Sequence, residues 1–337
     1  MSSNSRKSGR VTLQDVANKV GVTKITVSRA IRTPEKVSES LRLTIHKAID
    51  KMGYVPNRAA SMLSAKQSKT IVLIVPSLSN DVFADVVRGI NDVMLSQGFQ
   101  ILLGHSGYSL LEEERLIETY LQFGIDGIII SGTHHTERSN RLLRKSNLPV
   151  VEIMECNDNA IDMSVGLDHA QAGYKMTQHL IGKGYKNIGF AGARMDLRAQ
   201  LRLDGWRKAI WETELSDARV LTSSYASTYQ MGADMLTEIL GEWPDTDCIF
   251  FCNDDLAAGA LFECQRRNLK VPKDIALVGF NDLDICSATN PKLTSVCIPS
   301  FDIGEQAAKL LLKKINGEPI ENKHLDLGFI ISERAST

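Results

Sequence analysis

The chain has 337 residues, of which 43% are hydrophobic and 23% charged, and its formal net charge is −1. This length exceeds one ordinary domain, and the composition is typical of a soluble globular protein. No apolar run approaches the roughly 20 residues that span a bilayer, and the amino terminus lacks the apolar core of a secretion signal, so we expect a cytoplasmic protein without membrane contact. The six cysteines lack paired spacing, which favours reduced, buried thiols over a metal site or disulfides.

The near-neutral total conceals a strongly basic amino-terminal region. Residues 1–70 contain 14 Lys and Arg against four acids, whereas the remainder contains 25 against 36. Clustered basic residues in a small folded segment are typical of proteins that bind nucleic-acid phosphates. A basic disordered tail is the alternative, but apolar residues recur among these charges at helical spacing. Only the Ser-rich residues 1–10 have the composition of a disordered arm.

Residues 11–53 are predicted to form an all-α head of three helices. Thr12 and Thr23 can cap the first and second helices, Gly21 supplies the turn between them, and the third begins at Ser38. Two short helices joined across a glycine turn predict a helix-turn-helix, in which the second helix lies in the DNA major groove.

The start of the second helix carries the candidate base-reading residues. The predicted core does not use Lys24 or Ile25, and an exposed isoleucine is unfavourable unless it contacts an apolar group such as the thymine methyl. Arg29, one turn onward, can bind guanine through two hydrogen bonds. Thr26 and Ser28 are expected to contact the DNA backbone. The alternative is that Ile25 belongs to the core and Arg29 is a solvated surface charge.

Residues 54–66 are predicted to form a hinge segment. Pro56 disfavours helix in the residue before it, so the third helix must end near Gly53. Residues 57–66 favour helix, but isolated helices of this length are marginal in water. We therefore expect this segment to be disordered in the free protein and to fold when two copies pair on DNA. A plain alanine-rich linker is the alternative.

The string LQDVANKVGVTKITVSRAIR, followed after the third helix by GYVPNRAASMLSAKQS, resembles the lactose-repressor/galactose-repressor family of bacterial transcription factors. The resemblance covers the full length of the chain. It implies that bases are read by Lys24, Ile25 and Arg29.

The same resemblance implies a role for the hinge segment. In the family this helix enters the minor groove, and a leucine that matches Leu63 wedges into a central base step and kinks the DNA. Ala60 would lie in the groove, and Asn57 and Lys66 would lie near the DNA backbone.

Residues 67–337 alternate strand-like apolar runs with amphipathic helical stretches. One set of runs lies at 71–76, 101–105, 127–131 and 149–154, and a second at 187–193, 219–224, 248–253 and 276–282. Such a pattern predicts two doubly wound α/β subdomains with parallel sheets, and a ligand site at the carboxyl ends of the strands.

The resemblance implies the same architecture, a periplasmic-binding-protein-like effector domain whose chain crosses between subdomains three times. We expect these crossings near Asp168, near residues 298–300 and near Asn322, with the last strand, HLDLGFII, in the second subdomain. The first subdomain would then hold about 70–168 and 300–322, and the second about 169–298 and 323–337.

The predicted strand ends nominate an effector site, formed by Ser77, Phe83, Arg194, Arg198, Arg202, Asn253 and Asn281. Three arginines at a spacing of four favour an anionic ligand, because guanidinium groups bind carboxylates bidentately. Amide and carboxylate groups, including Asp282, suit a hydroxyl-rich ligand, so a sugar acid meets both requirements. In the family, Arg202 matches a ligand-gripping arginine, and Asn253 and Asn281 match polar sugar contacts.

Each nomination has an ordinary structural alternative. Asn253 can simply cap the following helix, Arg194 and Arg198 can be surface charges, and Phe83 can be core. His134 and His135 occupy a polar loop without metal-binding spacing, and we expect them at the surface.

The segments GARMDLR, FECQRRNLKVP and LDLGF resemble the gluconate-operon repressor branch of the family. This implies a repressor of gluconate-type sugar-acid genes, released from a pseudo-palindromic operator by its effector, and no cofactor. The short carboxyl terminus favours a homodimer. A family regulator that responds to idonate, ketogluconate or another sugar stays an alternative. A periplasmic solute-binding protein would need a signal peptide, and a doubly wound enzyme would need a motif such as GxGxxG after a strand, which is absent.

Overall fold

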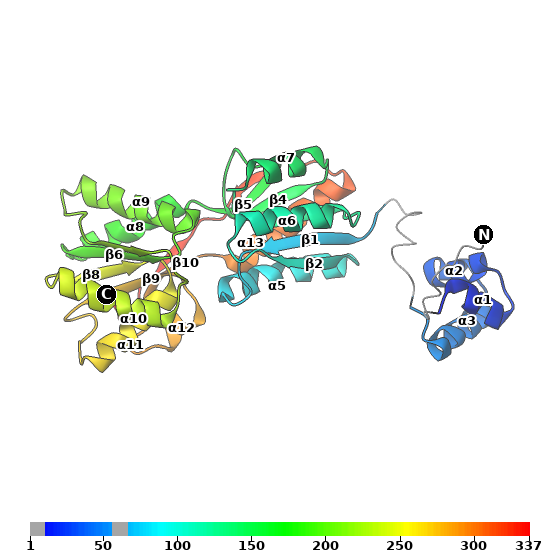
Figure 1. The fold of residues 1–337 in the computed structure, drawn as a ribbon, viewed down its shortest axis with the longest axis horizontal. Helices are drawn as coiled ribbons and strands as arrows, with labels where there is room; N and C mark the ends of the chain where they lie inside the picture. The colour runs from blue at the N-terminus through cyan, green and yellow to red at the C-terminus, as the bar shows by residue number, and fades with distance from the viewer. Residues whose placement is uncertain (1–10, 56–66) are drawn as a thin grey trace, which may run out of the picture. The chain divides into compact units, whose positions relative to one another are not determined.

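The computed structural model describes residues 11–55 and 67–337, and the chain divides into two compact units, Met1–Ser68 and Lys69–Thr337 (Figure 1). The predicted arm at 1–10 lies outside the described residues, as do the hinge positions Asn57, Ala60, Leu63 and Lys66. In the described ranges, no helix is long and apolar enough to cross a membrane.

Local signals in the sequence determine where the helices of the head begin and end. The head contains α1 (Leu13–Val20), α2 (Lys24–Arg32), the 3₁₀ helix η1 (Pro34–Lys36) and α3 (Glu39–Met52). Thr12 and Asp15 form a reciprocal capping box, and Thr23 caps α2. Gly21 ends α1 with a φ of 77°, which glycine adopts without strain. The predicted helix-turn-helix is confirmed, whereas the sequence did not indicate η1.

One small core holds the head together. Val16, Val27 and Ile45, one from each α-helix, are completely buried, and Tyr54 packs beside them. Ile25 lies outside this core with 62% of its surface exposed. The alternative that Ile25 is a core residue is therefore wrong.

The first subdomain is a six-stranded, fully parallel sheet in the order β11-β5-β4-β3-β1-β2. Its strands are β1 (Thr70–Val75), β2 (Gln100–His105), β3 (Gly127–Ser131), β4 (Val150–Glu155), β5 (Met163–Leu167) and β11 (His324–Asp326). Its helices are α5 (Asp81–Ser96), α6 (Leu110–Leu121), α7 (Glu137–Lys145) and α13 (Ser300–Asn316).

Both faces of this sheet are covered by helices. In β1, Ile71 and Leu73 belong to the apolar cluster that includes α5 and α13, whereas Val72 and Ile74 belong to the cluster that includes α6 and α7. Because successive strand residues point to opposite faces, the continuous apolar run follows from this double coverage.

The second subdomain repeats this plan in the order β12-β10-β9-β8-β6-β7. Its strands are β6 (Ile188–Ala193), β7 (Val220–Ser223), β8 (Cys248–Phe251), β9 (Ala276–Asn281), β10 (Thr294–Cys297) and β12 (Ile330–Ser332), of which only β12 is antiparallel to its neighbour. Its helices are α8 (His169–Gly182), α9 (Leu197–Glu212), α10 (Tyr229–Glu242), α11 (Asp254–Arg266) and α12 (Asp284–Ala288). The predicted fold class is confirmed.

The chain passes between the subdomains at three places. The first crossing follows β5 at Asp168 and the second follows β10 at residues 298–299, close to the expected positions. The third expectation is wrong, because β11 pairs with β5 in the first sheet and only β12 pairs with β10 in the second. The predicted last strand is therefore two short strands, and the crossing lies at residues 327–329 rather than near Asn322.

Two strands were not predicted from the sequence, and one histidine that was expected at the surface is buried. Strands β5 and β10 are short and lack a long apolar run, which explains the omission. His134 is exposed, but His135 is buried, with its Nδ1 2.6 Å from Glu113 Oε1 and its Nε2 3.2 Å from Glu152 Oε1. Local sequence cannot reveal this, because α6 and β4 supply the two carboxylates. None of the six cysteines forms a disulfide.

The buried His135 makes stability depend on pH. Burial alone would lower its pKa, but the hydrogen bonds that its ring donates to Glu113 and Glu152 raise the pKa from 6.5 to about 9. Charged His135 therefore stabilises the fold fully below about pH 6.5, and this contribution of roughly 3 kcal/mol disappears as pH rises through 9. Chemical unfolding at pH 6.5 and pH 9.5 measures the free energy of unfolding at each pH. This free energy should fall between the two pH values in the wild type and should fall less in His135→Gln. The His134→Gln control should behave like the wild type, and equal losses in all three would contradict the assignment.

Candidate functional site

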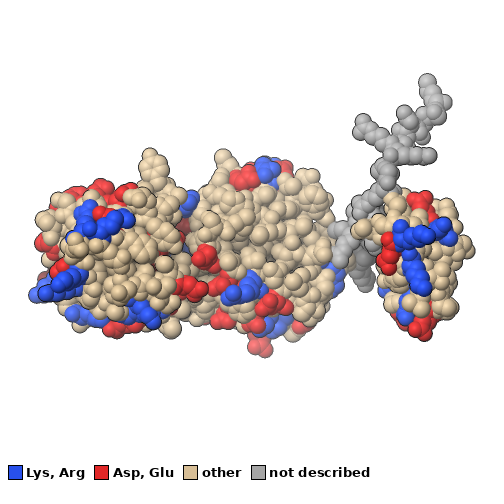
Figure 2. All heavy atoms as spheres, turned by 90° about the horizontal axis from the view of Figure 1, so that it is seen from below, with Lys and Arg blue, Asp and Glu red and all other residues tan. Residues whose placement is uncertain are grey.

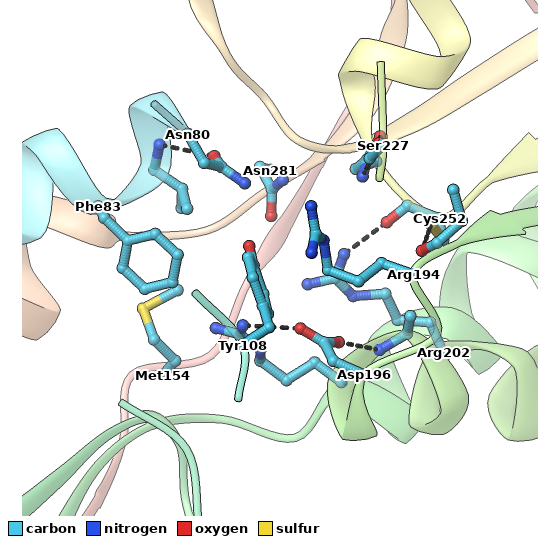
Figure 3. A pocket seen from close by; sticks show the side chains of 15 residues that line it. Asn80, Phe83, Tyr108, Met154, Arg194, Asp196, Arg202, Ser227, Cys252 and Asn281 are labelled. Atoms are coloured by element: carbon cyan, nitrogen blue, oxygen red, sulfur yellow. Dashed lines mark hydrogen bonds and ion pairs between the residues drawn. The ribbon is translucent and has the colours of Figure 1, made fainter. Parts of the chain in front are cut away.

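A polar cavity of about 60 Å³ lies between the two subdomains, at the carboxyl ends of their strands (Figure 3). We call it the arginine pocket. Residues of the first subdomain, among them Phe83 and Met154, face Arg194, Arg202 and other residues of the second across the pocket. Its lining comprises Asn80, Val82, Phe83, Tyr108, Met154, Ala193, Arg194, Asp196, Arg198, Ala199, Arg202, Ser227, Cys252, Asn253 and Asn281.

Arg202 is the most buried of the three arginines, with 7% of its surface exposed. Its Nη1 donates to the carbonyl of Cys252, its Nε donates to Nδ1 of His169 at 3.3 Å, and its guanidinium lies 3.6 Å from the ring centre of Phe280. Burial lowers the pKa of Arg202 to about 10, so it stays charged at neutral pH.

His169 links Arg202 to the first subdomain. Its Nε2 donates to the carbonyl of Met154 at 3.0 Å, so its Nδ1 is the acceptor for Arg202. Burial first, and then the charges of Arg202 and Arg198, hold the pKa of His169 well below its usual value. The neutral ring therefore connects residues of both subdomains at the first crossing.

The other two arginines contact aromatic rings of the opposite subdomain. Arg194 lies 4.1 Å from the ring centre of Tyr108, and Arg198 lies 5.4 Å from that of Phe83. Arg198 also pairs with Asp196 at 2.9 Å. Burial alone would raise the pKa of Asp196, but the charge of Arg198 and a hydrogen bond from the Ala199 amide hold it below its usual range. The carboxylate of Asp196 thus partly balances the charges of the three arginines.

Three helices begin at the pocket. Asn80, Asp196 and Asn253 are the N-caps of α5, α9 and α11, and each also lines the cavity. The amino end of a helix carries a partial positive charge and is favourable for an anion. Asn253 accepts the Leu256 amide at 3.1 Å, so it is a cap as well as a lining residue, and the two interpretations of it do not compete.

Strained backbone gathers around the pocket. Tyr108, Met154, Arg194 and Asn281 all line it and have positive φ, at 63°, 81°, 65° and 113°. Such conformations cost on the order of 1 to 3 kcal/mol each and persist only where surrounding contacts impose them, which is characteristic of functional sites.

A second compartment of about 240 Å³ adjoins the arginine pocket and shares Tyr108, Asp196 and Arg198 with it. Its wall in the first subdomain includes Ser131 and Glu155. The Thr133 hydroxyl donates to Glu155 at 2.5 Å, and burial raises the pKa of Glu155. Among the described residues that line this compartment, only Ser131 has a buried polar side-chain atom without a hydrogen-bond partner, its hydroxyl oxygen. Such a group is available to a ligand hydroxyl.

Six of the seven nominated effector residues line the arginine pocket, namely Phe83, Arg194, Arg198, Arg202, Asn253 and Asn281. Ser77 is not among the lining residues. Its hydroxyl accepts the Asn80 amide at 3.1 Å and so shapes the turn before α5. Asp282 is also outside the lining, because its carboxylate binds Arg334 of the C-terminal segment.

Several residues that line the pocket were not predicted from the sequence. Asn80 and Asp196 carried a usable signal, since each precedes a helix as a typical N-cap residue. Tyr108 and Met154 had none, because they line the pocket only when the subdomains come together.

The surface of the head presents the nominated DNA-reading residues. Lys24, Ile25 and Arg29 are exposed on α2, whereas Thr26 and Ser28 are half-buried. Thr26 lies in the first turn of α2, with its hydroxyl 3.0 Å from that of the N-cap residue Thr23. Figure 2 shows a connected band of Lys and Arg over one face of the head, while acidic and basic groups alternate over the larger unit.

Comparison with known proteins assigns the family. Residues 12–57 match the model for bacterial regulatory proteins of the lacI family, and residues 68–333 match that for periplasmic binding proteins and the sugar binding domain of the LacI family. The chain belongs to the LacI family.

Three relatives illustrate how far this LacI-family chain resembles known members. It is 42% identical over 330 residues to the HTH-type transcriptional regulator GntR of Escherichia coli K12, covering 98% of this chain and 99% of that one. It is 38% identical over 323 residues to the regulator IdnR of the same organism, covering 96% and 97%. The crystal structure of a LacI-family transcriptional regulator from Silicibacter pomeroyi superposes with a TM-score of 0.91 at 32% identity, covering 97% and 99%.

Proposed function

We propose that this LacI-family DNA-binding repressor controls genes for the uptake or breakdown of a gluconate-type sugar acid and leaves its operator when that acid binds between the subdomains. In this proposal the protein is a cytoplasmic homodimer without catalytic activity, and its operator is pseudo-palindromic, with half-sites about one DNA turn apart. The observation that carries the effector chemistry is the arginine pocket.

The pocket combines groups for an anion with groups for hydroxyls. Arg194 and Arg202 supply guanidinium donors beside three helix amino ends, which favours a carboxylate. Asn253 and Asn281 supply amides that both donate to and accept from hydroxyls. A polyhydroxylated monocarboxylate uses both kinds of group, whereas a neutral sugar brings no anion to Arg194 and Arg202.

The second compartment gives the carbon chain of such an acid room to extend. Its unpartnered Ser131 hydroxyl and the Thr133–Glu155 pair lie on the side of the first subdomain. An acid that reaches both compartments touches both subdomains. This is the condition for a ligand that changes their relative arrangement, because a ligand with equal affinity for two arrangements shifts neither.

Contacts across the cleft supply a physical basis for the switch. Arg194 and Arg198 bind the faces of Tyr108 and Phe83, which belong to the first subdomain. A ligand carboxylate competes with these rings for the guanidinium groups. The effector thereby replaces contacts that hold the subdomains in one arrangement.

In the head, we propose that Lys24, Ile25 and Arg29 read bases, while Thr26 and Ser28 contact the backbone. The exposure of Ile25, at 62%, supports this role, because a large apolar side chain on a polar surface favours an apolar partner. The roles of Asn57, Ala60, Leu63 and Lys66 in the minor groove stay predictions from the family resemblance.

Idonate or a ketogluconate is the alternative effector. The similarity to IdnR is a reason to include both acids in any test. A solute-binding protein is a remote alternative, because that role gives the helix-turn-helix head no function. The larger unit alone does not distinguish the two roles.

Arg29→Ala should weaken binding to the preferred operator by about 1 to 3 kcal/mol and relax specificity at one base pair. Fluorescence anisotropy with a set of single-substituted operators measures both effects. Lys47→Ala, an exposed substitution on α3, is the matched control and should leave the order of preference intact. An unchanged preference in Arg29→Ala would remove Arg29 from the base readers.

Leu63→Ala should reduce DNA bending and operator affinity while effector affinity stays at the wild-type value, because unstacking a base step is offset only when the wedge is present. Gel-shift analysis with permuted operator positions measures the bend. A bend angle equal to the wild type would count against the wedge.

Arg202→Ala should abolish the response to effector while operator binding persists. The direct test is calorimetric titration of the full chain with gluconate, idonate, 5-ketogluconate and 6-phosphogluconate, followed by release from operator DNA in each variant. Lys208→Ala, exposed on the same helix, is the control. An Arg202→Ala protein that gluconate still releases would refute the site, and a wild type that binds none of the four acids would refute the effector class.

Because Arg202 is buried, Arg194→Ala is a second variant that spares the core. Loss of one charge-assisted hydrogen bond costs about 1.5 to 3 kcal/mol, which corresponds to roughly 10- to 100-fold weaker effector binding.

A further inference from the structure

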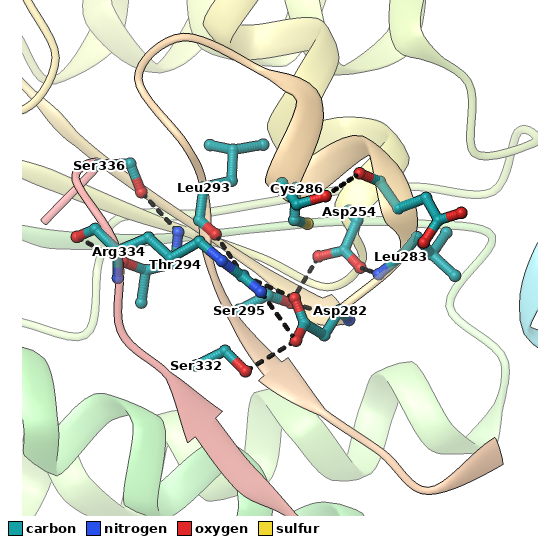
Figure 4. A network of polar contacts seen from close by, with 12 residues as sticks. Asp254, Asp282, Leu283, Cys286, Leu293, Thr294, Ser295, Ser332, Arg334 and Ser336 are labelled. Atoms are coloured by element: carbon teal, nitrogen blue, oxygen red, sulfur yellow. Dashed lines mark hydrogen bonds and ion pairs between the residues drawn. The ribbon is translucent and has the colours of Figure 1, made fainter.

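The C-terminal segment binds the turn that presents Asn281 to the arginine pocket (Figure 4). Arg334 holds the carboxylate of Asp282 with two hydrogen bonds, Nη1 to Oδ1 at 2.6 Å and Nη2 to Oδ2 at 3.1 Å. The hydroxyl of Ser332 donates to the same Oδ2 at 2.7 Å. Arg334 is itself held, since its Nη1 also donates to the carbonyl of Leu293 at 2.8 Å and its amide donates to Thr294 at 2.9 Å.

A second set of hydrogen bonds joins the same turn to the start of α11. The Ser295 hydroxyl accepts the Asp282 amide at 3.1 Å and donates to Asp254 Oδ1 at 2.6 Å. The other oxygen of Asp254 accepts the Leu283 amide at 2.9 Å. Asp254 is completely buried and directly follows Asn253. One network therefore supports both amides, Asn253 and Asn281, that face the pocket from the second subdomain.

The turn needs this support because its backbone is strained. Asn281 and Asp282 have φ values of 113° and 59°, which non-glycine residues rarely adopt. The strain relaxes unless neighbouring contacts oppose it. Two contacts of Asp282 oppose this relaxation. Arg334 holds the Asp282 carboxylate with two hydrogen bonds, and the Ser295 hydroxyl accepts a hydrogen bond from the Asp282 amide.

Charge supplies a second reason. Asp254 and Asp282 are two carboxylates next to the pocket residues Asn253 and Asn281. Burial raises the pKa of Asp254, and the Asp282 charge acts in the same direction, whereas hydrogen bonds from Ser295 and the Leu283 amide lower it. Arg334 compensates the Asp282 charge directly. Without it, the turn would carry uncompensated negative charge towards an anionic effector.

We infer that Arg334, which does not touch the pocket, is a positioning residue that sets effector affinity by holding the Asn281–Asp282 turn in its strained conformation. This inference rests on the proposed function, in that the effector binds the arginine pocket. It assigns the C-terminal segment a role in ligand recognition.

The test compares the full-length wild type with Arg334→Ala, Arg334→Lys, Asp282→Asn and the double variant Arg334→Ala/Asp282→Asn. The matched control is Lys183→Ala, because Lys183 anchors the same segment through Glu333 at 2.5 Å and the Thr337 carbonyl at 3.1 Å but is not among the pocket residues. Gluconate affinity is measured by calorimetry, operator affinity by fluorescence anisotropy, and Tm by scanning calorimetry.

Arg334→Ala should weaken gluconate binding at least ten-fold while operator affinity stays within two-fold. Arg334→Lys should recover part of the loss, because lysine restores the charge but not the planar fork. The double variant should be no weaker than Arg334→Ala, because both substitutions remove one interaction. Lys183→Ala should change Tm but not gluconate affinity. A gluconate affinity that is unchanged in Arg334→Ala, or losses that add in the double variant, would overturn the inference.

A measurement without effector separates this inference from the proposed function. Amide hydrogen exchange at residues 281–283 should become at least ten-fold faster in Arg334→Ala and stay at the wild-type rate in Lys183→Ala. Unchanged exchange overturns the positioning role whatever the effector is. Faster exchange in a protein whose wild type binds none of the sugar acids would instead reject the proposed effector class and keep the positional role of Arg334.

Discussion

Three guanidinium groups line one narrow cleft, and the surrounding structure must compensate their charge. Each arginine meets this constraint differently. Arg202 is buried against Phe280 and bonded to a carbonyl and a neutral histidine, Arg198 is paired with a carboxylate, and Arg194 rests on an aromatic ring. The charge that stays uncompensated is the basis of the proposal that the pocket binds an acid. The ring contacts come from the opposite subdomain, so under the proposed function a ligand that displaces them would alter the arrangement of the two subdomains.

The topology of the two sheets makes this cleft possible. Parallel strands end at one edge of a sheet, and the helices that follow them begin there, so each subdomain contributes loops, caps and helix amino ends to the same space. The N-cap residues Asn80, Asp196 and Asn253 serve both the helix and the pocket. The same side chains thus cap helices and line the pocket.

Buried polar networks support the walls of the cleft. On the side of the second subdomain, Arg334, Asp282 and Asp254 hold a strained turn beside Asn281. On the side of the first, charged His135 binds Glu113, which lines the second compartment, and Glu152. Removing one partner from such a network leaves a buried charge without compensation. The stability of each network is therefore expected to be sensitive to substitution and to pH.

The sequence by itself determined the elements whose causes are local. Capping residues and glycines set the limits of α1, α2 and α3, and apolar runs predicted eight of the strands, because these signals act within a few residues. The spacing of Arg194, Arg198 and Arg202 likewise predicted a shared surface. Only the tertiary structure decided the burial of His135, the division of the last predicted strand between two sheets, and the pairing of Asp282 with Arg334. Each of these depends on groups from distant segments, whose meeting follows from packing and not from any local pattern.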